Sequence, residues 1–102
     1  MHVTTIAEAR RFSLAHVERR PVIDAPDLRI DLVCFEAGQR EDALDYATTA
    51  VYQVLEGEAL VRAGEQVVRL GRGKVLRVDA GTTHALENAG GGLLVVQAIR
   101  PG

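Results

Sequence analysis

Apolar and polar residues alternate along the chain in short runs. In the clearest run, 28–36, apolar side chains fall on one face of an extended chain, and the charged side chains of Arg29 and Asp31 fall on the other. A repeat of two residues is typical of a half-buried β-strand. We predict one strand here, ending before Gly38, with an apolar face formed by Leu28, Ile30, Leu32 and Cys34.

Further short apolar segments follow, and most of them are separated by turns that contain glycine. Many short strands at this spacing indicate an all-β sandwich or barrel rather than alternating βαβ units. The polar stretch 39–42 is predicted to be a loop, and Glu56–Glu58 the turn of a hairpin. The remaining predicted strands are 50–55, 59–62, 67–70, 75–78, 85–88 and 93–99.

The first 27 residues have a different pattern. Residues 6–12 have helical spacing and follow two threonines that can cap a helix, so we predict a short opening helix or turn. Pro21 and Pro26 interrupt the segment after Val17, and proline cannot donate a hydrogen bond to a strand ladder. The segment 21–24 is therefore expected to be an edge strand or an extended arm.

The composition is that of an ordinary globular protein. The chain has 102 residues, of which 47% are hydrophobic and 25% charged, as in a soluble single domain. A formal net charge of −2 without a basic stripe argues against a nucleic-acid partner. We find no signal-peptide pattern and no segment apolar enough to span a membrane. The single Cys34, expected to be buried, fits a reducing cytoplasm, and His2 and His16 are expected to face solvent.

One spaced motif stands out near the end of the chain. In 73–88, the pattern of residues resembles the second conserved motif of the cupin superfamily, G-x5-P-x-G-x2-H-x3-N, with Asp79 in place of the proline. The four matching positions are Gly73, Gly81, His84 and Asn88.

The resemblance covers 28–101 and implies a small jelly-roll β-barrel, preceded by an N-terminal helix or arm over 1–27, in one domain. Taken alone, the strand pattern also admits another small jelly roll or an open barrel. Small cupins commonly form homodimers by exchanging N-terminal strands. The arm 17–27 carries apolar residues that such an exchange would bury, so we expect a homodimer.

The first cupin motif, G-x5-H-x-H-x3,4-E-x6-G, has lost most of its metal ligands in this chain. With the shorter spacing between Gly38 and Gly57, Leu44 and Tyr46 occupy the two histidine positions and Ala50 occupies the glutamate position. The resemblance therefore identifies three of the four usual ligands as absent.

With the longer spacing, the two histidine positions fall on Ala43 and Asp45, so that only His84 remains in place. Zinc and transition metals need three or four converging nitrogen, oxygen or sulfur ligands. We therefore predict no metal and no other cofactor. A weak site at His84 with Asp45 or Tyr46 is the alternative.

Apolar side chains in place of metal ligands predict a drier cavity that holds one small apolar or aromatic molecule. By the resemblance, its lining consists of His84, Tyr46, Tyr52, Leu44 and Ala50. His84 is the candidate catalytic residue, as a general acid or base, because imidazole titrates near neutral pH. The alternative is a histidine packed in the barrel and hydrogen-bonded to a neighbouring Tyr or Asn.

Three functions are consistent with this sequence. The first is a homodimeric cupin that binds a small molecule without a tightly bound metal. The second is an enzyme, either an isomerase or lyase that uses His84 as acid or base, or an oxygenase-like cupin in which His84 still holds a metal. The third is a structural dimer whose barrel is filled by side chains. A cupin fold does not by itself define a ligand, substrate or pathway, because one fold hosts many unrelated functions.

Overall fold

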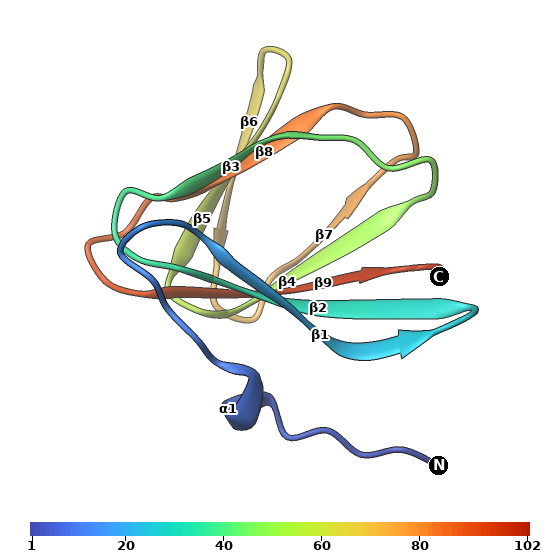
Figure 1. Cartoon of the computed structure of the whole chain (residues 1–102). Coiled ribbons are helices and arrows are strands. Elements are labelled where there is room, and N and C mark those ends of the chain that lie inside the picture. Colours follow the sequence, from blue (N-terminus) through green and yellow to red (C-terminus); the bar gives the residue numbers. More distant parts are fainter.

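The computed structural model describes residues 1–102 and contains one short helix and nine strands (Figure 1). The strands predicted between residues 28 and 99 are all present, with ends within one residue of their expected positions. The all-β expectation is confirmed. None of the helical residues form a segment with the length and apolar character needed to cross a bilayer. The elements are α1 (Ile6–Ala9), β1 (Glu18–Ala25), β2 (Leu28–Phe35), β3 (Arg40–Leu44), β4 (Ala50–Glu56), β5 (Glu58–Ala63), β6 (Gln66–Gly71), β7 (Val75–Val78), β8 (His84–Asn88) and β9 (Leu94–Arg100).

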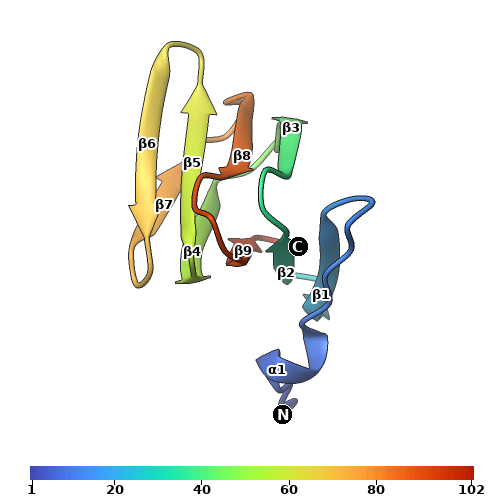
Figure 2. The ribbon, with the colours of Figure 1, turned by 90° about the vertical axis from the view of Figure 1, so that its left-hand side faces the viewer.

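The strands form two antiparallel sheets that enclose the main core. One sheet has five strands in the order β1-β2-β9-β4-β7, and the other has four in the order β3-β8-β5-β6. Figure 2 shows the four-stranded sheet with β6, β5, β8 and β3 following one another from left to right. Alternate residues of the strands point between the sheets, as the period of two requires. The main core consists of Val33, Phe35, Ala50, Tyr52, Val54, Ala59, Val61, Leu70, Val78, Leu86, Leu94, Val96 and Ala98.

The strand β2 differs from the half-buried strand that we predicted. Residues 31–35 are all buried, so both faces of this part of the strand are covered. The face that carries Asp31 also carries Val33 and Phe35 of the main core, and Asp31 itself is only 2% exposed. The face that looked like the core side in the sequence lies on the outside of the barrel. The prediction failed because sequence alternation does not show what covers each face.

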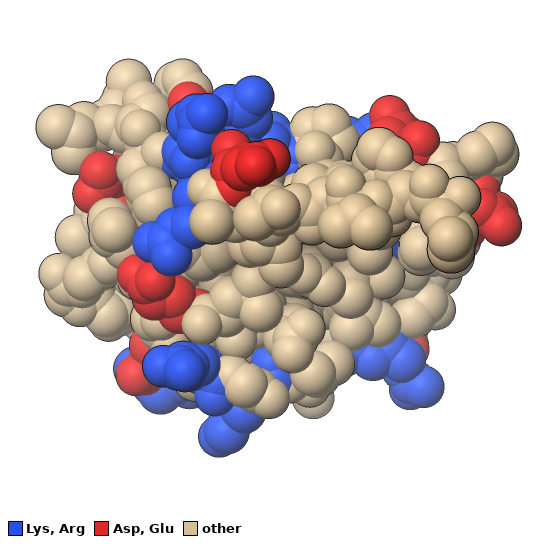
Figure 3. All heavy atoms as spheres, turned by 90° about the horizontal axis from the view of Figure 1, so that it is seen from below, with Lys and Arg blue, Asp and Glu red and all other residues tan.

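The N-terminal segment covers the outer face of β2. The predicted helix over 6–12 ends at Ala9, because Arg10 has an extended backbone from which the chain continues across the sheet. Phe12 packs against a second small core of three buried residues, Leu32, Cys34 and Val95. Burial raises the pKa of the Cys34 thiol. Seen from below, this face has a broad uncharged area across its centre and right, and most charged side chains lie to the left of that area or along the edges (Figure 3).

The two polar segments before β4 form strands at the edges of the sheets. β1 is the edge strand expected around Pro21, and its register with β2 shifts directly after that proline. It pairs with β2 of the same chain, so the expected homodimer stays a prediction. The stretch 39–42, predicted to be a loop, belongs mostly to β3, which pairs with β8. The strand was not predicted because its sequence is polar. Its Glu41 faces inward all the same, since a charged partner lies beside it.

That partner is Arg19 of β1, which joins the two sheets. Its Nε and Nη2 atoms donate hydrogen bonds of 3.1 and 2.8 Å to the carboxylate of Glu41 on β3. Its Nη1 atom donates to Asp31 on β2 at 3.0 Å, and Nε of Arg29 donates to the other Asp31 oxygen at 2.8 Å. We call these four residues the Arg19 cluster. The bidentate contact between Arg19 and Glu41 closes the barrel where the edge strands β1 and β3 meet.

Substitution of Arg19 tests how much this closure stabilises the fold. Arg19→Met should lower the free energy of unfolding by roughly 3 kcal/mol, because the change removes the arginine that bonds Glu41 and one of the two that bond Asp31, and both carboxylates are largely buried. The neighbouring Arg20 is exposed and provides a matched control. Arg20→Met should change the free energy by less than about 0.5 kcal/mol. Equal losses for the two variants in urea denaturation would show that the cluster does not hold the sheets together.

Candidate functional site

The centre of the barrel contains a buried hydrogen-bonded pair, Tyr52 and His84. Tyr52 lies on β4 and His84 begins β8, and their side chains point towards each other between the two sheets. Tyr52 is 0% and His84 3% exposed. The Tyr52 hydroxyl lies 2.6 Å from Nε2 of His84, and Nδ1 of His84 lies 2.8 Å from the carbonyl oxygen of Thr82. A carbonyl oxygen only accepts, so Nδ1 carries the proton and Nε2 accepts the hydrogen bond from Tyr52.

The remaining predicted site residues pack around this pair. Leu44 lies opposite His84 in the β3–β8 ladder, and the Tyr46 ring centroid lies 6.1 Å from that of His84. Ala50 precedes Tyr52 on the same face of β4 and is also buried. The structure thus brings the five predicted residues together. They fill the centre of the barrel, and none of them lines a cavity.

The same packing affects the ionisation of Tyr52. Burial raises the pKa of Tyr52 far above its ordinary value, and the neighbouring Tyr46 raises it further. Tyr52 therefore stays a neutral hydrogen-bond donor at any physiological pH. Both ring nitrogens of His84 have partners within the protein. In this arrangement neither nitrogen is free to exchange a proton with a substrate.

Charged residues that the sequence analysis did not select lie beside Tyr46. Burial alone would lower the pKa of Arg19, but its hydrogen bonds to Glu41 and the negative charge of that residue raise it above its ordinary value. The guanidinium of Arg100 lies over the Tyr46 ring, with Cζ 4.8 Å from the ring centroid. The only sequence signal was the placement of Arg29 and Asp31 on one face of a strand, which the alternation assigns to the solvent side.

A cavity of about 180 Å³ lies at the opposite edge of the barrel, between β5 and β6 of one sheet and β7 of the other. Figure 1 shows β6 and β7 diverging from the turn that joins them. Five of the nine lining residues are apolar, and polar residues complete the wall. The lining consists of Val61, Ala63, Gln66, Val68, Leu76, Arg77, Val78, Asp79 and Thr82.

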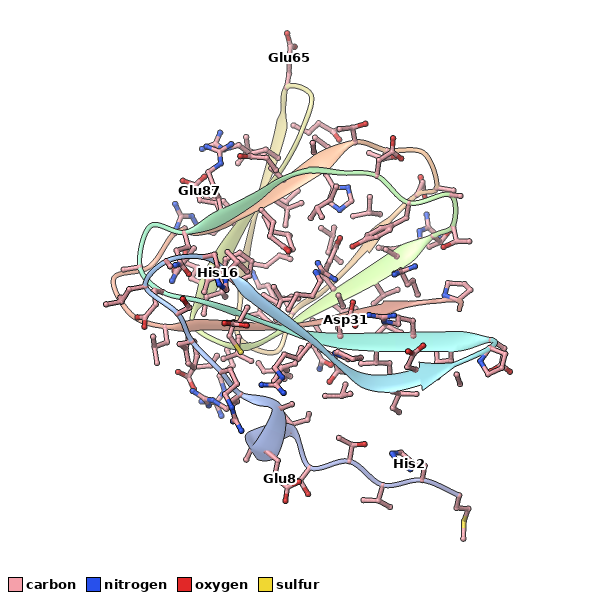
Figure 4. The ribbon with its side chains drawn as sticks, viewed as in Figure 1. His2, Glu8, His16, Asp31, Glu65 and Glu87 are labelled. Carbon is pink, nitrogen blue, oxygen red and sulfur yellow. The ribbon has the colours of Figure 1, made fainter.

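The cavity adjoins the central pair. Thr82, which lines the cavity, is the residue whose carbonyl oxygen bonds His84. Leu76 of the lining lies opposite Tyr52 in the β4–β7 ladder. Sequence reasoning missed this space because its walls come from three consecutive strands and a loop, and no local pattern shows where β7 leaves the other two strands to join the second sheet. His2 and His16 are both exposed, and His2 lies on the N-terminal tail away from the barrel (Figure 4).

Two facing antiparallel sheets, closed around a buried histidine, define a small jelly-roll barrel protein. The family described as "Cupin domain" matches residues 31–99. The chain therefore belongs to the cupin family. An uncharacterised protein of Streptomyces coelicolor is 27% identical over 75 residues, which span 74% of this chain and 71% of that protein.

Solved structures share the fold over nearly the whole chain. A protein from Thermus thermophilus has 24% identity and a TM-score of 0.89, with coverage of 99% of this chain and 98% of that one. An RmlC-like cupin protein from Desulfovibrio desulfuricans has 25% identity and a TM-score of 0.83, with coverage of 97% and 95%. A Klebsiella pneumoniae protein with a double-stranded β-helix domain has 21% identity and a TM-score of 0.89, with coverage of 100% and 91%.

The motif residues of this chain do not fit the metal that the fold family implies. The structure contains no group of three or more His, Cys, Asp or Glu side chains arranged to hold an ion. Leu44 and Ala50 offer no ligand atoms, and Nε2 of His84 is occupied by Tyr52. Asp45, the alternative oxygen ligand, is exposed and accepts a hydrogen bond from Thr83 at 3.3 Å. Asn88 is structural, because its Nδ2 atom donates to three backbone carbonyl oxygens.

Tyr52→Phe tests the central hydrogen bond. The variant leaves Nε2 of His84 buried without a donor, so the free energy of unfolding should fall by about 1–3 kcal/mol. Tyr46→Phe makes the same chemical change on a partly exposed ring and should cost less. Similar losses in the two variants would contradict the importance of the pair.

The raised pKa of Tyr52 adds a pH dependence to this test. Above about pH 10 the unfolded chain loses the phenol proton that folded Tyr52 retains, so the wild type becomes less stable as pH rises. Tyr52→Phe lacks this contribution, and its stability should fall less steeply between about pH 9 and 11. If the free energy of unfolding, measured by denaturation at each pH, falls equally steeply with pH in the variant and the wild type, this prediction is wrong.

Proposed function

We propose that this cupin binds a small molecule in the cavity between β5, β6 and β7, and that it does so without a metal held by its own side chains. The observation that carries the proposal is that the centre of the barrel is filled by side chains, whereas one edge of the barrel contains a cavity. The position that holds the metal in the family motif is filled by Tyr52, His84 and Leu44, and free volume lies instead at the β6–β7 edge.

The size of the cavity limits the ligand. At about 180 Å³ it lies below the range of roughly 300–1,000 Å³ that is common for sites of drug-sized ligands. An apolar cavity of about 150 Å³ is enough to hold benzene. The wall between β5 and β7 is mainly Val61, Val68, Leu76 and Val78, so the buried part of the ligand is apolar.

The binding role is favoured over acid–base catalysis by His84. A general acid or base must reach the proton that it transfers, directly or through one water molecule. His84 is 3% exposed and both of its ring nitrogens are bonded within the protein. The cavity, in contrast, is partly open to solvent, and its lining residue Val68 is 40% exposed.

Metal content tests the first half of the proposal. Protein purified without chelator and without a nickel column should contain far less than one transition-metal ion per chain by elemental analysis, because one bonded imidazole cannot replace the ligands of an aqueous ion. A triple variant, Leu44→His with Tyr46→His and Ala50→Glu, restores the motif and should gain metal. Near-stoichiometric metal in the wild type that is lost in His84→Ala would contradict the proposal.

Titration with benzyl alcohol, followed by amide chemical shifts, tests the second half. The shifts should cluster around Val61, Val68 and Val78. Ala63→Phe places a ring in the cavity and should abolish them. Val75→Phe adds the same ring on β7 at a residue that is 60% exposed and outside the lining, so it should leave binding unchanged. Shifts that are scattered, or that survive Ala63→Phe, would place binding elsewhere.

A further inference from the structure

The cavity lining has one positive charge, on Arg77, and one negative charge, on Asp79. Of the nine lining residues, Arg77 is the only basic one, and it lies on the edge strand β7. Gln66 and Thr82 add hydrogen-bond donors to the same lining. A ligand in this space therefore meets both apolar side chains and hydrogen-bond donors.

Arg77 and two arginines of the neighbouring sheet each contact one carboxylate, but only Arg77 belongs to the cavity lining. Arg62 donates to Glu87 at 3.4 Å, and Arg69 donates to Glu58. Arg77 contacts a single carboxylate, that of Asp79, through Nε at 3.3 Å. A guanidinium has five N–H donors in a planar fork, so contact at Nε leaves the edge formed by Nη1 and Nη2 for a second partner.

The contact between Arg77 and Asp79 is a feature of this chain and not of the family motif. It occupies the position at which the motif pattern has proline, and proline has no charge with which to hold an arginine. Asp79 thus occupies one edge of the Arg77 guanidinium, and both residues belong to the lining of the cavity. An acceptor that suits the other edge is a carboxylate, because its two oxygens match the fork in a bidentate contact.

We infer that the cavity recognises a small monocarboxylate with an apolar aliphatic or aromatic body. The body lies against the valine side chains and Leu76, and the carboxylate faces Arg77, with Gln66 and Thr82 as further donors. This inference rests on the proposed binding function and specifies its ligand class.

Benzoate and benzamide test carboxylate recognition separately from binding in the cavity, because the two molecules have nearly the same shape and differ in charge. In calorimetric titrations at low salt, benzoate should bind about fivefold more tightly than benzamide, as expected for a contact with a largely exposed arginine. Added salt should reduce the ratio, because exposed charges are screened.

Arg77→Gln should bring the ratio of the two affinities close to one, because it weakens benzoate binding more than benzamide binding. Arg72→Gln removes an exposed arginine in the turn before β7, outside the cavity lining, and should keep the wild-type ratio. Equal binding of the two compounds by the wild type, or a preference that survives Arg77→Gln, would overturn the carboxylate inference and leave the binding function intact. If neither compound binds, the binding function fails as well.

Discussion

The contact of Arg19 with Glu41 and Asp31 is the interaction on which the rest of this barrel depends. Each sheet has two edge strands, and the sheets can enclose an interior only where these edges approach each other. At the β1–β3 edge, a charged side chain that is largely buried bridges the gap with bidentate geometry. At the β6–β7 edge no such bridge exists, and the strands diverge around the cavity. One ionic closure therefore decides which side of the molecule is sealed and which is accessible.

The strands could be predicted well and their faces less well. Strand positions follow from the alternation of residues and from turn glycines, both of which are local properties, and β7 was predicted to the residue. The inward direction of β2 was wrong because it depends on Phe12, which covers the other face from a distant part of the chain. β3 was missed for a related reason. Its inward-facing Glu41 looks like a solvent residue until Arg19 is known to lie beside it.

The candidate site shows the same limit. The motif located His84, and the register of the first motif placed Tyr46 and Leu44 near it, as the structure shows. No pattern in the chain tells whether these residues surround a space or fill it, because that depends on side-chain volumes from several strands. The hydrogen bond from Tyr52 decides the matter, since it occupies the nitrogen that a ligand or ion would need. The cavity formed where two strands separate, and strand separation has no sequence pattern.

The cover over Cys34 has a practical consequence. Its thiol is 1% exposed, and burial keeps it in the protonated, unreactive form. A thiol reagent reaches it only after the segment around Phe12 has lifted from the sheet, while the main core stays intact. Because this is the single cysteine of the chain, the rate of its labelling reports the opening of the cover over Cys34 under conditions in which the whole chain rarely unfolds. Cys34 is thus a natural probe of local opening of the N-terminal segment, and no cysteine has to be introduced.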